Sequence, residues 1–293
     1  MSGAASSGTD YEYRAMTRTF VNRHWLKSNW VLLIAICFLA VLVVSALIAP
    51  HLLATDPLAM NPSQRLKPPS SAHWFGTDGY GRDVFARTIY GGRVSLLVGI
   101  SVAVLASVAG AVIGILAGYL SLLDRFIMRV MDGIMSIPGI VLAVALMALF
   151  RASVMTVVIA IMIPEIPRVA RLVRSMVLTI REQEYIQAAI VSGSGLSRIL
   201  LRHVLPNTAG PLAVQATFVC ASAILLEAYL SFLGVGLPQD VPTWGNIMSA
   251  GRTSVQIAFW SIFYPGIVLA LAILSINVIG DSIRDIYDPR ARS

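Results

Sequence analysis

Residues 94–123 read VSLLVGISVAVLASVAGAVIGILAGYLSLL, a run of 30 residues without a charged side chain. About 20 consecutive apolar residues are enough for a helix to cross the ~30 Å hydrocarbon core of a bilayer. This stretch is therefore predicted to be a transmembrane helix. Gly110, Gly114 and Gly118 recur in it every four residues and leave a flat face for close helix packing, either within the chain or against another subunit.

The composition of the whole chain agrees with this assignment. Of its 293 residues, 57% are hydrophobic and 13% are charged, whereas soluble domains carry about 25% charged residues. A soluble fold of this composition would have too little polar surface to cover itself. The fold class is therefore predicted to be an all-α integral membrane protein.

Apolar stretches separated by polar, Gly-rich or Pro-rich segments predict six transmembrane helices. The predicted spans cover residues 30–50, 94–123, 133–150, 152–173, 210–233 and 255–280. An even number of crossings puts both termini on one side. The net charge of +7 comes mostly from arginines beside the spans, and their distribution predicts that the termini are cytoplasmic. The same scatter argues against nucleic-acid binding, which favours one basic stripe.

The predicted spans divide the chain into five parts. They are a basic cytoplasmic segment at 1–29, a first transmembrane helix at 30–50, an extracytoplasmic Pro/Gly-rich segment with a short helix at 51–93, a five-helix core at 94–283 that contains a loop at 179–207, and a cytoplasmic tail at 284–293.

The segment at 51–93 has one short predicted helix. Asp83 is a suitable N-cap for residues 84–90, and Gly91-Gly92 is expected to end that helix. His73, Asp78 and Asp83 could bind a divalent ion, but a turn stabilised by side-chain caps is the favoured interpretation. No other metal site is predicted.

The longest polar connection between the apolar halves is 184–207, EYIQAAIVSGSGLSRILLRHVLPN. It is predicted to form a short helix, a break at Gly193 and Gly195, a second short helix and a stop at Pro206. Such a unit suits a knob that fills a groove in another protein. The alternative is an amphipathic surface hairpin without a partner.

Two acidic residues lie inside predicted spans. A charge in a span costs a few kcal/mol, so each should face a partner or a water-filled path. For Glu165 the plain alternative is a pair with Arg168 or another arginine near the end of the span. For Glu227, lining a translocation path and bridging to a partner subunit are equally open.

No catalytic constellation appears. A Walker A motif needs a Gly-Lys-Ser/Thr grip on phosphate, and Lys27 and Lys67 are the only lysines. The chain is therefore not predicted to be an enzyme by itself or to bind a cofactor.

The loop at 184–207 resembles the EAA loop of importer-type ABC permeases. The matching residues are Gln187-Ala188-Ala189, Gly193 and His203-Val204-Leu205-Pro206. In that family the loop is the coupling helix that docks on the cytoplasmic ATPase. The resemblance therefore implies an ATPase-coupling set of Glu184, Gln187, Ala188, Ala189, Gly193, Leu205 and Pro206. Gln187 stands where Glu is usual, and His203 stands where an aliphatic residue is usual. The missing carboxylate at Gln187 puts one charged contact with the ATPase in doubt.

Further motifs narrow the resemblance to the C-type subunit of the dipeptide/oligopeptide/nickel permeases. They are HWFGTDGYGRDVFARTIYGGR at 73–93, SFLGVGLP at 231–238, PTWGNIMSAGR at 242–252 and Asp288-Pro289-Arg290.

The family resemblance implies a type I ABC importer fold in the bacterial inner membrane that works by alternating access. The implied partners are a second homologous permease, two ABC ATPase domains that hold the ATP and Mg, and an extracytoplasmic substrate-binding protein. The expected function is peptide import. Nickel or glutathione import within the family, and an ion-coupled secondary transporter using Glu165 or Glu227, are the alternatives.

Overall fold

The computed structural model describes residues 30–52 and 56–287. The basic segment at 1–29 and the last six residues of the tail, 288–293, lie outside this part of the chain. Within it the protein is helical, and its one β-bridge joins Thr77 and Asp83. The predicted all-α class is confirmed.

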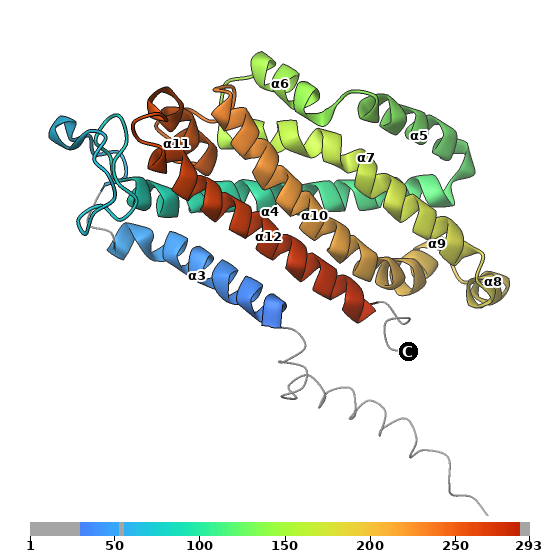
Figure 1. The fold of residues 1–293 in the computed structure, drawn as a ribbon. Helices are drawn as coiled ribbons and strands as arrows, with labels where there is room; N and C mark the ends of the chain where they lie inside the picture. Colours follow the sequence, from blue (N-terminus) through green and yellow to red (C-terminus); the bar gives the residue numbers. More distant parts are fainter. Residues whose placement is uncertain (1–29, 53–55, 288–293) are drawn as a thin grey trace, which may run out of the picture.

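Five long helices run side by side through the molecule (Figure 1). They are α3 (Trp30–Leu52), α4 (Val84–Tyr119), α7 (Val154–Arg181), α10 (Leu205–Phe232) and α12 (Trp260–Tyr287). The shorter elements are η1 (Pro62–Gln64), α5 (Ser121–Met135), α6 (Gly139–Leu149), α8 (Glu184–Val191), α9 (Leu196–Ile199), η2 (Leu200–Val204), α11 (Trp244–Gly251) and η3 (Arg252–Ser254).

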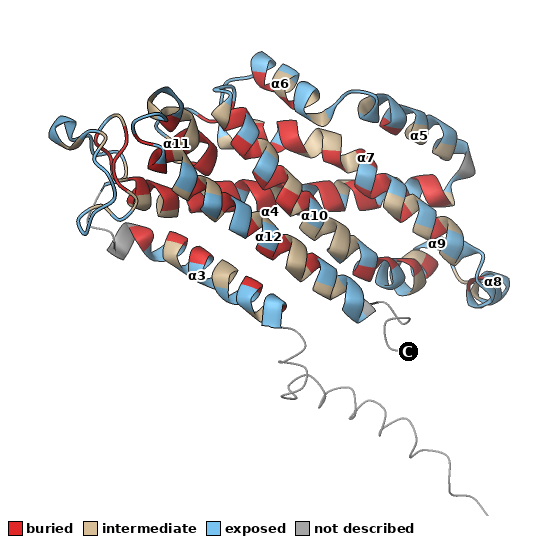
Figure 2. Ribbon diagram, in the orientation of Figure 1, coloured by how far each residue is buried: buried red, intermediate tan, exposed pale blue. Residues whose placement is uncertain are grey.

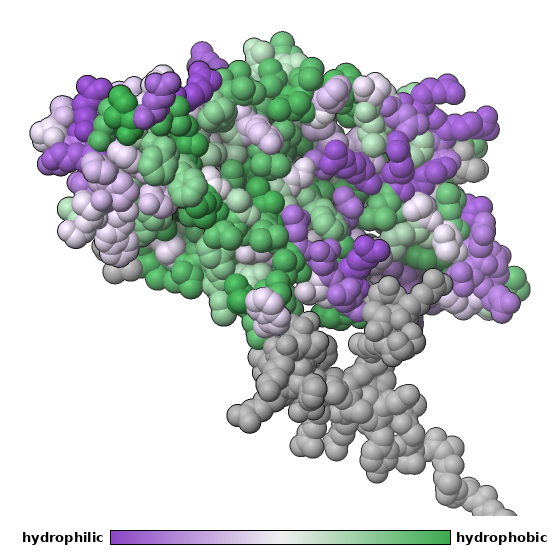
Figure 3. Space-filling view, in the orientation of Figure 1, coloured by the Kyte–Doolittle hydropathy of each residue, from purple (hydrophilic) through white to green (hydrophobic). Residues whose placement is uncertain are grey.

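Several of these helices suit a bilayer. Helices α3, α4 and α12 and the continuous stretch at 196–232 are long and apolar enough to cross it. Together, α5 and α6 form a fifth candidate, bent by 87° at the break between them. Helix α7 has 28 residues and lies along α4, but it contains four charged residues before its last two turns. Figure 3 shows hydrophobic surface over the middle of the helices and hydrophilic side chains at the two ends.

The core lies around α4. Helix α4 is buried along most of its length (Figure 2) because α3, α7, α10 and α11 pack around it. The indole of Trp244 in α11 is fully buried and donates a hydrogen bond from Nε1 to the Thr88 carbonyl in α4, at 3.0 Å. At the same end, Trp260 Nε1 donates to the Thr77 carbonyl at 3.1 Å, which connects the segment at 56–83 to the start of α12.

The predicted end of the short helix at 84–90 is wrong. Asp83 does cap the helix, since its carboxylate accepts from the Ala86 N–H at 2.8 Å, but α4 continues through Gly91-Gly92 to Tyr119. A Cβ at Gly91 would lie 3.2 Å from Thr243 Cα, and a Cβ at Gly92 would lie 3.3 Å from the Trp244 ring. These glycines therefore admit α11 and do not terminate the helix.

The span predicted at 133–150 is also wrong as a single helix. Helix α5 ends at Met135 and α6 begins at Gly139. Pro138 lacks an N–H and disfavours helical geometry at the residue before it, so the chain bends there. Residues 124–132, which separate the predicted spans at 94–123 and 133–150, belong to the amphipathic helix α5.

Further boundaries differ from the prediction, and the span predicted to end at 123 ends at Tyr119. Pro206 does not close the central loop but lies inside the continuous helical stretch at 196–232, just after the π-helical turn. A π-helical turn at 200–204 joins α9 to α10 without a break. The last long helix begins at Trp260, after the turn at 252–254, and not at Val255.

Candidate functional site

The loop at 184–207 projects from one end of the helix bundle, at α8 and α9 (Figure 1). Helix α8 ends at Val191, and the chain then turns at Gly193, whose φ is +78°. The Gly193 N–H donates to the Ile190 carbonyl at 2.9 Å and the Ser194 N–H to the Ala189 carbonyl at 3.0 Å. This is a Schellman ending, which needs a left-handed residue at the position of Gly193.

Three apolar side chains hold the loop to the bundle. Ile186, Ile199 and Val204 are almost completely buried and join the main hydrophobic core. They alternate with side chains that point outward, so the loop has a fixed inner side and a free outer side. Ile186 is not among the predicted residues of this loop, although isoleucine is one of the residue types most often buried.

The outer side of the loop exposes large apolar side chains among charged ones such as Arg198 and Arg202. Val191 is 88% exposed, and Leu201, Tyr185, Leu196 and Ile190 are also exposed. Exposed apolar side chains gathered in this way are typical of a protein–protein contact. Of the predicted coupling residues, Ala189 and Gly193 take part in the turn. Those that are exposed are Glu184, Gln187, Ala188, Gly193, Leu205 and Pro206.

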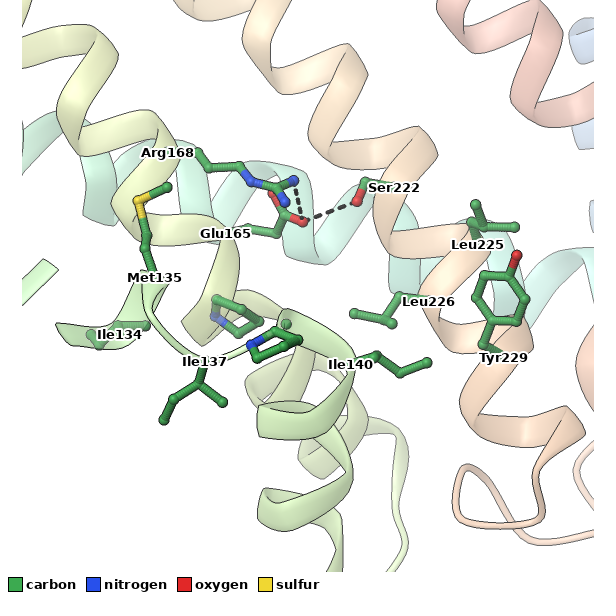
Figure 4. A pocket seen from close by; sticks show the side chains of 13 residues that line it. Ile134, Met135, Ile137, Ile140, Glu165, Arg168, Ser222, Leu225, Leu226 and Tyr229 are labelled. Carbon is green, nitrogen blue, oxygen red and sulfur yellow. Dashed lines mark hydrogen bonds and ion pairs between the residues drawn. The ribbon is translucent and has the colours of Figure 1, made fainter. Parts of the chain in front are cut away.

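A second feature is a hollow where the break between α5 and α6 meets α7 and α10 (Figure 4). Its volume is ≈ 430 Å³. Glu165 is nearly buried at its wall, and its Oε1 accepts from Ser222 Oγ at 3.0 Å and from Arg168 Nη1 at 3.2 Å. The pair with Arg168 that the sequence predicted as the plain alternative is present. The other lining residues are Ile134, Met135, Ile137, Pro138, Gly139, Ile140, Pro164, Leu225, Leu226 and Tyr229.

Glu227 does not line this hollow. It is fully buried between α4 and α10, where Oε2 accepts from Ser95 Oγ at 2.9 Å and Oε1 accepts from Ser231 Oγ at 2.8 Å. Ser95 Oγ also accepts a long hydrogen bond from the Trp244 N–H at 3.4 Å. In this conformation the carboxylate therefore links α4, α10 and α11 inside the chain.

The three glycines predicted for helix packing all face α7. A Cβ on Gly114 would lie 2.6 Å from the Ala170 carbonyl oxygen, and one on Gly118 would lie 2.7 Å from Val177 Cβ. Gly110 makes the same approach to Val169. The close contact lies within the chain, and it brings α7, which leads directly into the loop at 184–207, against the central helix.

Two of the three acidic residues in the segment at 56–83, Asp78 and Asp83, are paired. His73 Nδ1 lies 2.7 Å from Asp83 Oδ2, and Arg82 Nε donates to Asp78 Oδ2 at 2.7 Å. Within the described residues, no group of three metal-binding side chains comes together. Caps and ion pairs account for these side chains.

A wider hollow of ≈ 660 Å³ opens at the end opposite α8. One wall comes from the segment at 56–83, through Met60, Arg65 and Tyr80, and the other from 239–253, through Gln239 and Asp240. It is a concave surface large enough to receive a loop of another protein.

Comparison with known proteins gives one consistent picture. The sequence profile of the family described as "Binding-protein-dependent transport system inner membrane component" matches residues 110–293. The "Probable peptide ABC transporter permease protein y4tQ" of Sinorhizobium fredii is 50% identical over 233 residues, which cover 80% of each chain. The "Dipeptide transport system permease protein DppC" of Alkalihalophilus pseudofirmus is 43% identical over 234 residues, covering 80% of this chain and 77% of the relative.

The fold is also similar to a solved structure. The MetNI methionine ABC transporter in an inward-facing conformation aligns with a TM-score of 0.52 at 20% identity, covering 66% of this chain and 95% of the matched chain. At that identity the likeness concerns the fold alone. It confirms the predicted type I ABC importer permease fold.

Proposed function

The chain belongs to the family of binding-protein-dependent transport system inner membrane components, and from that premise we propose that it is the permease subunit of an ATP-driven peptide importer. The substrate class is supported by the relatives at 43–50% identity, which are named as peptide or dipeptide permeases. Because the chain has no Walker A motif, the ATPase that drives transport is a separate partner.

The proposed assembly contains this chain, a second homologous permease, two ABC ATPase domains that bind ATP and Mg, and a substrate-binding protein. The end with α8 faces the cytoplasm, and so do both termini. The end with α11 faces the binding protein, which uses the hollow at Met60, Tyr80 and Asp240. Lipid surrounds the apolar outer surfaces of α3 and α12, where Ile34, Val41 and Leu274 are exposed.

The loop at 184–207 carries the proposed coupling. Its outer side exposes apolar side chains such as Val191, while Ile186, Ile199 and Val204 anchor its inner side in the core. A force applied at the loop is therefore passed to α7, which precedes it, and to α10, which follows it. Closure of the ATPases on ATP would move these two helices as rigid rods and open the pathway by alternating access.

The single observation that carries this proposal is that exposed apolar side chains such as Val191 stand on a loop whose inner side is anchored in the core between α7 and α10. The experiment introduces Val191→Cys into a background in which Cys37 and Cys220 are replaced by Ala, and reconstitutes the complex with its ATPases and binding protein. We expect the introduced thiol to crosslink to an ATPase, and the complex to take up peptide in an ATP-dependent manner. Met60→Cys, at the opposite end, is the control and should crosslink only to the binding protein.

Two results would overturn the proposal. One is labelling of the Val191→Cys variant by a membrane-impermeant thiol reagent from the outside of intact cells. The other is uptake that persists at the same rate without ATP, which would favour the ion-coupled carrier.

A further inference from the structure

The hollow at the α5–α6 break lies deep along α7 and α10. Glu165 is 11 residues from the start of α7, which places it roughly 16 Å along the helix at 1.5 Å per residue. Ser222 is 10 residues from the end of α10, roughly 15 Å from that end. Both values are about half of the ~30 Å hydrocarbon thickness.

This side of the molecule cannot face lipid at that depth. The Arg168 side chain is 56% exposed, one turn from the Glu165 carboxylate, which is 5% exposed. A half-exposed guanidinium in hydrocarbon costs several kcal/mol, so such groups face water or protein. The outward surfaces of α3 and α12 are apolar by contrast. The hollow therefore opens toward an aqueous path or toward the facing subunit.

The ion pair inside the hollow is loose. A single nitrogen, Arg168 Nη1, lies 3.2 Å and 3.3 Å from the two Glu165 oxygens. Charge-assisted hydrogen bonds usually measure about 2.7–2.9 Å, and Arg82 reaches Asp78 at 2.7 Å in this same chain. Ser222 orients the Glu165 carboxylate from the other side. A carboxylate has about four acceptor positions, so Glu165 keeps capacity for another cation.

The rest of the hollow is apolar and adaptable. Ile137, Ile140, Leu225, Leu226 and Tyr229 form its walls in Figure 4, and Met135 lies at its edge. The volume of ≈ 430 Å³ falls in the range of about 300–1,000 Å³ that is usual for small-molecule sites. Aliphatic walls accept side chains of different shapes, and Met adjusts to them.

We propose that this hollow is a transient binding site for the amino terminus of a peptide, whose ammonium group takes the place of Arg168 on Glu165 while its first side chains contact the apolar walls. This inference rests on the proposed function, since it names the part of the peptide that this subunit holds. Because the peptide ammonium gains Glu165 only by displacing Arg168, the net gain in binding free energy is small. The peptide can therefore leave the site again during transport.

The experiment uses the complete complex in lipid nanodiscs, without the binding protein, so that any peptide bound is bound by the membrane part. The probe is a tripeptide with a free amino terminus and a benzophenone side chain at its second residue. Its twin is acetylated at the amino terminus. After irradiation, the labelled residues of this chain are identified and quantified by mass spectrometry.

We expect the free-amine probe to label the lining of the hollow, with Met135 and Leu226 as the principal positions. Acetylation of the probe should reduce this labelling by at least about fivefold, because a charge-assisted hydrogen bond is lost. Glu165→Gln should reduce labelling by the free-amine probe to the same level and abolish the difference between the two probes. Asp281→Asn, which removes an exposed carboxylate of α12, should leave labelling unchanged.

The inference is overturned if the two probes label wild-type protein equally, or if the label lies outside the hollow. The comparison of the two probes needs no variant, so it holds even if Glu165→Gln fails to assemble. ATP-dependent peptide uptake by the wild-type complex with its binding protein is measured in parallel in proteoliposomes. Uptake without labelling refutes the site alone, whereas absence of uptake refutes the proposed function.

Discussion

Glu227 in α10 accepts a hydrogen bond from Ser95 in α4 at 2.9 Å, across 132 residues of sequence, and both side chains are fully buried. The second Glu227 oxygen accepts from Ser231 one turn later. Because the Trp244 N–H reaches Ser95 as well, one carboxylate organises the contact among α4, α10 and α11.

This arrangement predicts different effects for two substitutions at Glu227. Glu227→Ala leaves the Ser95 and Ser231 hydroxyls without their acceptor and opens a void, so we expect a loss of about 2–4 kcal/mol in stability. Glu227→Gln keeps a side-chain oxygen in place and should cost less than half as much. Thermal unfolding of the purified chain in detergent measures both. Equal losses for the two variants would contradict the role assigned to these hydrogen bonds.

The left-handed turn at Gly193 predicts uncoupling when a branched residue is introduced. Nothing lies within 4 Å of a Cβ at this position. Gly193→Val therefore acts only through backbone strain, which costs about 1–2 kcal/mol. The turn should relax and misplace α8, so that ATP hydrolysis continues while peptide uptake falls several-fold. The measurement is the ratio of peptide taken up to ATP hydrolysed in proteoliposomes.

Two controls make the Gly193 prediction specific. Gly193→Asn should retain most of the coupling, since Asn tolerates positive φ. Gly195→Val is the matched control, because Gly195 is two residues away, equally open, and has φ −66°. Loss of coupling in Gly195→Val to the same extent would show that bulk matters here and that the turn conformation does not.

Substitution of the α4 glycines that face α7 is predicted to disturb helix packing and to leave the contact with the ATPase unchanged. A Cβ on Gly114 would lie 2.6 Å from the Ala170 carbonyl oxygen and 2.8 Å from Val173 Cβ, so Gly114→Ala should force α4 and α7 apart at a cost of about 1–3 kcal/mol. The readout is the thermal midpoint in detergent. Gly133→Ala in α5, where nothing lies within 4 Å, should instead stabilise the protein by about 0.5–1 kcal/mol. A neutral Gly114→Ala would refute the close contact.

Two ion pairs hold α5 to α7, and they are expected to differ in strength. Arg174 contacts Asp124 through two nitrogens, with Nη2 to Oδ2 at 2.6 Å, in a partly covered position. Arg171 contacts Asp132 through one nitrogen, and both side chains are more than half exposed. In double-mutant cycles with Ala, the first pair should give a coupling of about 1 kcal/mol and the second less than about 0.5 kcal/mol. The reverse order would contradict this geometry.

Local sequence was enough for the features that depend on neighbouring residues along the chain. Uncharged runs such as 94–123 specify membrane helices, because length and apolarity decide partitioning into a bilayer. Asp83 caps α4 and Gly193 ends α8 as expected, because a cap or a left-handed turn is made by the residue itself and the backbone within one turn of it. The motifs that pointed to the family are of the same kind.

What depends on distant contacts was decided only in three dimensions. Gly91-Gly92 has the sequence of a helix ending, yet α4 continues because α11 packs where side chains would be. Pro206 has the sequence of a stop, yet it lies inside the continuous helical stretch at 196–232. Glu165 and Ser222 are 57 residues apart, and only the packing of α7 on α10 brings them to one hollow. Glycine widens and proline narrows the conformations open to the local backbone. Neither residue determines which distant helix packs beside it, and that packing decides whether the helix ends or continues.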